Sequence, residues 1–169
     1  MRRVLIIGSP GAGKSTLSRE LAQRTGLPLH HLDRLYWNPG WVEPDEQEWR
    51  HEVARLVSEP RWIIDGNYGG TLPLRLDRAD TVIDLDLPAW LCVVGILRRL
   101  IGSQARARPD MAAGCRERPN REFVEFVAYT ATFPRRVRPR ITQKMRGFGG
   151  RYVRLRSRAE IDRFLAELT

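Results

Sequence analysis

The segment Gly8–Ser15, with the sequence GSPGAGKS, constrains the fold of this chain more than any other feature. It fits the pattern G-x-x-x-x-G-K-[ST], in which glycines let backbone N–H groups surround a polyphosphate and the lysine contacts it. Residues 4–7 (VLII) predict a short buried strand before this loop, and residues 15–22 predict a helix after it. Strand, loop and helix in this order predict a binding site for a nucleoside triphosphate.

Each polar residue of the loop has an expected task. Only two of the 29 Lys and Arg residues are lysines, and one of them is Lys14, which we expect to contact the β- and γ-phosphates. We expect Ser15 to bind Mg²⁺ and Thr16 to bind the α-phosphate. The other residues expected to surround the phosphates are Gly8, Ser9, Pro10, Gly11, Ala12 and Gly13. ATP is the default nucleotide, because a guanine-specific Asn/Lys-x-Asp pattern is not evident.

Strand and helix patterns alternate along the rest of the chain. Strands are expected at residues 27–32, 62–65, 81–85 and 151–155, in addition to the first. Helices are expected from the N-cap Asp45 to about Val57, after Pro88, over 120–132 and over 159–168. This alternation predicts an α/β fold in which helices cover both faces of a parallel sheet. At 169 residues, the chain is expected to form a single domain, 1–169.

Acidic residues end several of the expected strands, and ligands of such sheets bind at the carboxyl ends of the strands. Asp65 is the expected magnesium-side acid, because it ends an apolar strand and a Gly-Asn turn follows. Asp84 and Asp86 are expected to support their strand end and the next helix. Asp33 has two interpretations: a base or orienting group at an acceptor hydroxyl, or a helix cap or partner of Arg34.

The chain resembles small P-loop kinases of the adenylate kinase-like superfamily, and more closely the group of DNA topology modulation proteins (FlaR-type). The resemblance covers nearly the whole chain. The runs that carry it are 8–15, His31-Leu32-Asp33 with Trp37 and Trp41, 63–68, 84–88, Arg98-Arg99 and 108–115. It implies a five-stranded parallel sheet of order 2-3-1-4-5, an acceptor-binding flap at 34–60 and a short lid at about 99–120. It also implies Asp65 on the magnesium side and Arg99, Arg106 and Arg108 as lid residues.

The acceptor site departs from that of adenylate kinases. Those enzymes have Asp-Gly-Phe-Pro-Arg where this chain has Asp65-Gly66-Asn67-Tyr68-Gly69, so the arginine that holds an acceptor phosphate is missing. A nucleoside monophosphate is therefore not the expected acceptor. Asn67 and Tyr68 are expected to face the acceptor. The aromatic residues after Asp33 have two interpretations, as packing of a small helical flap, which we favour, or as a wall for the acceptor. For His30 and His31 we expect only strand-end packing.

Charge is distributed unevenly along the chain. Residues 1–97 contain 11 Lys and Arg against 13 Asp and Glu, whereas residues 98–169 contain 18 against 7. Such a basic half suits a polyanion, either nucleotide phosphates or nucleic acid, although an arginine-rich solvated surface explains most of it. Cys92 and Cys115 have no metal-binding or disulfide spacing, which is typical of reduced thiols in a cytoplasmic protein. The apolar run 89–101 is too short for a membrane span.

Three functions are compatible with these features. The first is a phosphotransferase that moves the γ-phosphate of Mg-ATP to a small-molecule acceptor. The second is a nucleotide-dependent DNA-binding or topology regulator, for which the sequence contains no recognised nucleic-acid-binding motif. The third is an ATPase-type nucleotide sensor with no acceptor. The sequence favours the first and leaves the acceptor and the oligomeric state open.

Overall fold

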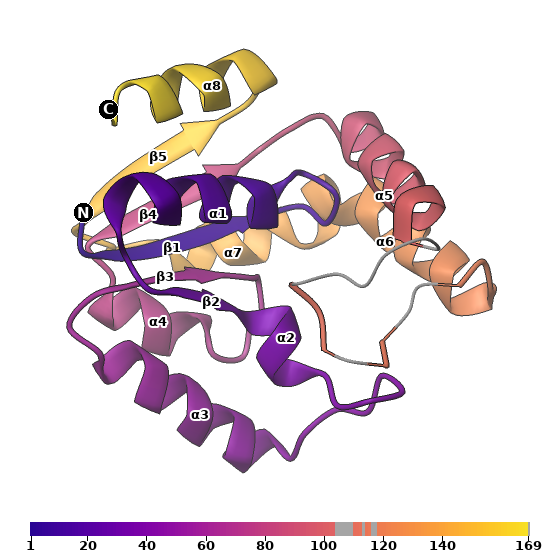
Figure 1. Ribbon diagram of the computed structural model, residues 1–169, viewed down its shortest axis with the longest axis horizontal. Coiled ribbons are helices and arrows are strands. Elements are labelled where there is room, and N and C mark those ends of the chain that lie inside the picture. Colours follow the sequence, from indigo (N-terminus) through magenta and orange to yellow (C-terminus); the bar gives the residue numbers. More distant parts are fainter. Residues whose placement is uncertain (104–109, 113, 116–117, 169) are drawn as a thin grey trace.

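A computed structural model describes residues 1–103, 110–112, 114–115 and 118–168. Strands and helices alternate through most of this part of the chain (Figure 1). In chain order they are β1 Arg3–Gly8, α1 Lys14–Thr25, β2 Leu29–His31, α2 Leu32–Tyr36, α3 Glu46–Ser58, β3 Trp62–Asp65, α4 Leu72–Arg78, β4 Thr81–Leu85, α5 Ala89–Ser103, α6 Arg121–Arg136, α7 Arg138–Lys144, β5 Arg151–Leu155 and α8 Arg158–Ala166.

The strands form one five-stranded sheet in the order β2-β3-β1-β4-β5. Each neighbouring pair is parallel, and β1 lies in the centre between β3 and β4. The central strands are nearly continuous runs of buried residues, as expected where both faces of a parallel sheet are covered. The predicted fold class and strand order are therefore confirmed.

Alternate residues of β1 enter two separate cores. Val4 and Ile6 pack with residues of α1 and α8 on one face, whereas Leu5 and Ile7 pack with residues of α3 and α4 on the other. Helices α1 and α8 accordingly lie on one side of the sheet and α3 and α4 on the opposite side (Figure 1). Helices α5 and α6 pack against each other beyond the end of the sheet where the chain passes from β1 to α1. The predicted helical cover of both faces is confirmed.

Several local features differ from the predicted elements. The strand expected over residues 27–32 is only three residues long, and Asp33 lies in the first turn of the short helix α2 instead of at a strand end. Helices α4 and α7 were not predicted, because each has only seven residues and contains a proline in its first turn. Asp45 is confirmed as the N-cap of α3, since its carboxylate accepts hydrogen bonds from the amides of Gln47 and Glu48.

Asp80 fastens the start of β1 to the start of β4. Its carboxylate accepts hydrogen bonds from the Arg2 and Arg3 amides, at 2.9 and 2.8 Å, and from the Thr81 hydroxyl at 2.7 Å. Partial burial raises the pKa of Asp80, but the hydrogen bonds from Thr81, Arg3 and Arg2 outweigh burial and hold the pKa below its ordinary value of 3.8.

We expect Asp80→Ala to lower the free energy of unfolding by about 2 kcal/mol at pH 7, because three hydrogen bonds to a charged group are lost. Since the folded-state pKa is lower than the unfolded one, this contribution is present above pH 3.8 and disappears as pH falls through the folded value. Urea unfolding at pH 7 and at pH 3 checks this, with Asp162→Ala, at an exposed site in α8, as the control. An equal loss at both pH values would contradict the assigned role.

Candidate functional site: the cleft at the phosphate-binding loop

The loop between β1 and α1 follows a path that requires glycine at three positions. Gly8, Gly11 and Gly13 have φ values of 141°, 75° and 97°, which L-amino acids rarely adopt. A Cβ atom on Gly8 would lie 2.5 Å from the carbonyl oxygen of Leu85, and one on Gly11 would lie 2.1 Å from that of Cys92. Backbone conformation therefore favours glycine at all three positions, and close packing against β4 and α5 also requires it at Gly8 and Gly11.

A fourth glycine completes this contact from the side of α5. A Cβ on Gly95 would lie 2.4 Å from the carbonyl oxygen of Gly11. In an exposed helix, alanine would stabilise the fold by up to about 1 kcal/mol relative to glycine. Here the clash, which costs roughly 1–3 kcal/mol, is the larger effect.

We therefore expect Gly95→Ala to lower the free energy of unfolding by about 1–2 kcal/mol and to weaken binding of nucleotide phosphates, because the loop must shift away from α5. Thermal denaturation and calorimetric titration with Mg-ADP measure the two effects. Gly149→Ala is the control, because a Cβ there meets no atom within 4 Å. A stabilised Gly95→Ala protein with unchanged nucleotide affinity would contradict the expectation.

Lys14 lies between the loop and two acids. Its Nζ donates hydrogen bonds to the carbonyl oxygens of Gly8 and Ser9, both at 3.0 Å. Burial lowers the pKa of the Lys14 ammonium, and the negative charges of Asp33 and Asp65 partly oppose this change. The ammonium is thus fixed at the mouth of the loop, within the electrostatic influence of both carboxylates.

Asp65 ends β3 beside the phosphate-binding loop and is 4% exposed. Its Oδ2 accepts a hydrogen bond from the Ser18 hydroxyl at 3.1 Å, and its Oδ1 lies 2.9 Å from Nδ1 of His31. We had expected only packing from His31. His31 of β2 is the direct neighbour of Asp65 of β3 in the parallel register, which the sequence alone does not show.

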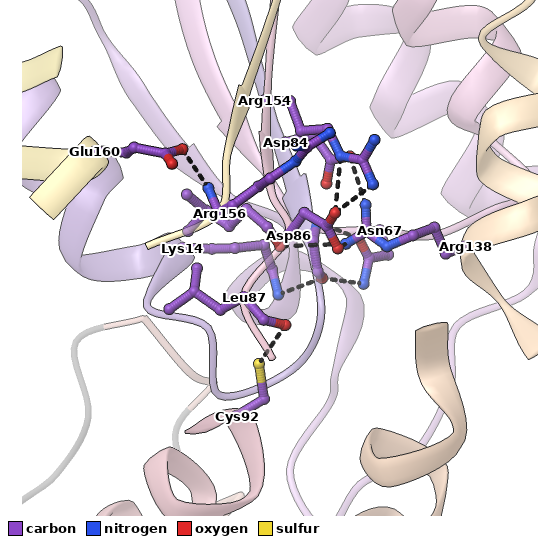
Figure 2. Close-up of polar contacts among 12 residues, drawn as sticks. Lys14, Asn67, Asp84, Asp86, Leu87, Cys92, Arg138, Arg154, Arg156 and Glu160 are labelled. Carbon is purple, nitrogen blue, oxygen red and sulfur yellow. Dashed lines mark hydrogen bonds and ion pairs between the residues drawn. The ribbon is translucent and has the colours of Figure 1, made fainter. Parts of the chain in front are cut away.

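Asn67 binds the loop itself. Its Oδ1 accepts a hydrogen bond from the Gly8 amide at 3.1 Å, and its Nδ2 donates to the Gly8 carbonyl oxygen at 2.8 Å. Figure 2 shows the Asn67 and Lys14 side chains converging on this region. Asn67 lines the cleft, and both polar ends of its amide bind Gly8, the first residue of the loop.

Tyr68 binds Asp33. The Tyr68 hydroxyl donates a hydrogen bond of 2.7 Å to Oδ1 of Asp33, and this links the turn after β3 to the first turn of α2. Burial and the negative charge of Asp33 raise the pKa of Tyr68 well above its usual range, so the hydroxyl stays protonated and remains a donor. Tyr68 also has a φ of 32°, an uncommon backbone conformation for a residue with a side chain.

Aromatic side chains continue from Tyr68 along one wall of the cleft. Tyr36 packs against Trp37, Trp49 and Tyr68, with ring centroids 5.0, 5.1 and 4.6 Å apart. Trp37 in turn contacts Trp41 at 5.3 Å. Trp49 of α3 is buried in the core, whereas Trp37, Trp41 and Tyr68 line the cleft. Tyr36 and Trp49 therefore pack the flap as expected, whereas a wall for the acceptor stays a prediction for Trp37 and Trp41.

The cleft has a volume of about 1360 Å³, which exceeds the roughly 300–1,000 Å³ typical of a pocket for one small ligand. It brings together the phosphate-binding loop, the two expected acids, the aromatic wall, and arginines of α5. The expected site residues that line it are Pro10, Gly11, Gly13, Lys14, Ser15, Thr16, Asp33, Asp65 and Arg99. Further lining residues that we did not predict include Arg19, Asp110, Met111 and Arg158.

The lid residues can be placed only in part. Arg99 of α5 lines the cleft, and its guanidinium lies over the ring of Phe126 in α6, 5.7 Å from the centroid. Arg106 and Arg108 lie outside the described residues. Beyond that gap, Asp110 and Met111 are buried and line the cleft, and the Cys115 thiol donates to the Asn38 carbonyl oxygen at 3.2 Å. The described part of the 99–120 segment therefore contacts the start of the 34–60 segment.

Asp84 and Asp86 form hydrogen bonds and ion pairs near the β5 edge of the sheet. Asp84 accepts hydrogen bonds from Arg138 at 2.7 Å and Tyr152 at 2.8 Å, and Asp86 pairs with both Arg138 and Arg154 (Figure 2). They join the end of β4 to α7 and β5, which agrees with their expected support of the strand end. Part of the basic charge of the second half of the chain is thereby neutralised within the protein.

Comparisons with known proteins support the fold. No family model and no curated protein matches the chain. Among solved structures, it is similar to shikimate kinase from Acinetobacter baumannii in complex with shikimate (TM-score 0.63, 15% identity, 99% of this chain and 90% of that one). It is also similar to shikimate kinase from Bacteroides thetaiotaomicron (TM-score 0.58, 19% identity, 99% and 95%). At such identities the likeness shows a shared fold. In the described part of the chain, no helix is long and apolar enough to cross a membrane.

Proposed function

We propose that this protein is an ATP-dependent phosphotransferase that moves the γ-phosphate of Mg-ATP to a hydroxyl group of a small molecule. The observation that carries the proposal is one cleft lined both by Lys14 of the glycine-rich loop and by Asp33 of α2, whose negative charge acts on the Lys14 ammonium. The volume of the cleft leaves room for a nucleotide and a second ligand. Two of the fold neighbours are shikimate kinases, which agrees with a hydroxylated acceptor.

The donor side of the cleft suits ATP. The three glycines at positive φ give the loop a backbone path that other residues rarely adopt, and α1 adds the partial positive charge of its N-terminus. Lys14 would bind the β- and γ-phosphates and stabilise charge that develops between them.

The donor set also fits Mg²⁺. The Ser15 hydroxyl and the Asp65 carboxylate are hard oxygen ligands at the edge of the loop, and Mg²⁺ takes most of its remaining ligands from phosphates and water. Because Ser18 and His31 already occupy the two oxygens of Asp65, this carboxylate would hold the ion through a water molecule. When bound, the ion supplies neutralisation of phosphate charge.

On the acceptor side, Asp33 would orient and deprotonate the attacking hydroxyl. Tyr68 holds Oδ1 of Asp33, and Oδ2 would accept the proton. The acceptor oxygen then forms a bond to the γ-phosphorus while the bond from that phosphorus to the β,γ-bridging oxygen breaks, and ADP leaves. Trp37 and Trp41 would pack against an apolar part of the acceptor.

Arginines would complete the site. Arg99 lines the cleft, and Arg106 and Arg108 belong to the same proposed lid, residues 99–120. Charge on the transferred phosphoryl group needs cations, and arginines brought in on closure supply them in other phosphotransferases.

The test is transfer of label from γ-labelled Mg-ATP to a panel of nucleosides, nucleotides, sugars, polyols and hydroxylated carboxylates such as shikimate. Label in an organic product supports the proposal, and deconvolution of the panel identifies the acceptor. Slow release of inorganic phosphate that no acceptor changes would favour an ATPase-type sensor instead. A duplex DNA mobility shift at physiological salt, without transfer of label, would favour the DNA-binding alternative.

A further inference from the structure

A fully buried arginine lies behind the turn that connects β3 to α4. Arg75 of α4 has 0% exposure. Its Nη1 donates to the Gly66 carbonyl oxygen at 2.9 Å, and its Nη2 donates to the carbonyl oxygens of Asn67 and Tyr68, the latter at 2.9 Å. One guanidinium thus binds the carbonyl oxygens of three consecutive residues.

Burying a charged group costs several kcal/mol of folding free energy before its hydrogen bonds are counted, so a buried arginine is not explained by stability alone. Burial lowers the pKa of Arg75 to about 9, so the side chain remains a cation at neutral pH. Its hydrogen-bond acceptors are backbone carbonyls, and these fix the conformation of the turn. The turn needs such fixing, since Gly66 has a φ of 133° and Tyr68 has a φ of 32°.

The side chains of this turn reach the two halves of the cleft. Asn67 holds both backbone polar groups of Gly8 at the start of the phosphate-binding loop. Tyr68 holds Asp33 on the acceptor side. A displacement of the 66–68 backbone would therefore disturb both the donor and the acceptor sites.

We propose that Arg75 is a positioning residue, which holds the 66–68 turn so that Asn67 shapes the phosphate-binding loop and Tyr68 orients Asp33. The acceptor half of this inference rests on the proposed phosphotransferase function. The nucleotide half requires only that the loop binds a nucleotide. Arg75 is fully buried and does not line the cleft, so its effect on a ligand must pass through Asn67 and Tyr68.

The test is a double-mutant cycle on nucleotide affinity, with Mg-ADP as the probe in calorimetric titrations of the full chain. Arg75→Lys keeps the charge but cannot hold three carbonyls in the planar arrangement of a guanidinium. We expect Arg75→Lys and Asn67→Ala each to weaken binding by roughly five- to tenfold, because two hydrogen bonds to Gly8 are lost or misplaced. The double variant should bind no more weakly than Asn67→Ala alone.

Arg78→Lys is the matched control, since Arg78 lies on the same helix at an exposed position. A merely structural Arg75 would lower the melting temperature while leaving the affinity of the folded protein unchanged, and that result overturns the proposal. Losses that multiply in the double variant also overturn it. If Arg75→Lys does not fold, Asn67→Ala still tests the proposal. Unchanged nucleotide affinity in Asn67→Ala would show that the 66–68 turn does not shape the loop for binding.

Failure of the proposed function would be recognisable separately. The double-mutant cycle could show the expected coupling in a protein that transfers phosphate to no acceptor. Arg75 would then be the positioning residue of a nucleotide site, and the proposed phosphotransferase function would be rejected. If transfer is found, Arg75→Lys should lower kcat in the protein that keeps Tyr68. In a protein that already carries Tyr68→Phe, the same substitution should lower kcat little further.

Discussion

Lys14→Ala is expected to lower kcat for phosphate transfer by about 10²–10³-fold, which is the usual cost of removing one preorganised donor from a developing anion. The reason lies in the position of the ammonium, which bridges the Gly8 and Ser9 carbonyl oxygens at the mouth of the loop and lies within the influence of Asp33 and Asp65. Nucleotide affinity should also fall, because Lys14 would bind the same phosphates in the ground state. Single-turnover transfer and Mg-ADP titration separate the two effects.

The most informative companion is Lys14→Arg. It keeps the positive charge, but the planar guanidinium is too broad to replace a point charge in the closely packed loop, so we expect it to restore little activity. Arg163→Ala, which removes an exposed cation from α8, should behave as wild type. Near-wild-type transfer by Lys14→Ala would place the chemistry somewhere other than this loop.

Asp33→Asn is expected to lower kcat by about 10²–10⁴-fold, the range found for loss of a general base. The amide keeps the size of the carboxylate but cannot take the proton of the attacking hydroxyl. Since Asp33 faces the loop from α2 and is not part of it, the affinity for Mg-ADP should change little. Steady-state kinetics with the identified acceptor, together with nucleotide titration, give the required comparison.

Two further variants serve as comparisons for Asp33→Asn. Tyr68→Phe removes only the hydrogen bond to Oδ1 of Asp33, so a smaller loss, of about tenfold, is expected. Asp77→Asn neutralises an exposed carboxylate on α4 and should have no effect. If Asp33→Asn weakened nucleotide binding and left the rate of transfer from bound ATP intact, Asp33 would belong to the donor site and the proposed base would have to be sought elsewhere.

The sheet and the loop were predictable because their signals are local. Residues 62–65 and 81–85 are short apolar runs with clear ends, and both strands occur at those residues. The glycines of the loop form a pattern whose physical reason is present in the structure as positive φ angles and close backbone contacts. Strand order came from resemblance, and the parallel pairings confirm it.

The missed features depend on contacts between distant residues. Nothing in the sequence near Arg75 marks it as buried, because its partners are backbone carbonyls, which have no side-chain signature. Asp33 was expected to end a strand, since the apolar pattern of residues 27–32 does not show that the chain turns into α2 after His31. The pairing of His31 with Asp65 depends on the register between two strands, and only an aligned pair of strands shows it.

The aromatic wall has a practical consequence for finding the acceptor. Two of the five indoles, those of Trp37 and Trp41, line the cleft. Trp49 of α3 and Trp62 of β3 are buried in the core, and Trp90 is mostly exposed. A ligand that enters the cleft is therefore expected to change the emission of Trp37 and Trp41. The protein thus has a built-in optical reporter, and candidate compounds can be screened by fluorescence before any enzymatic assay exists.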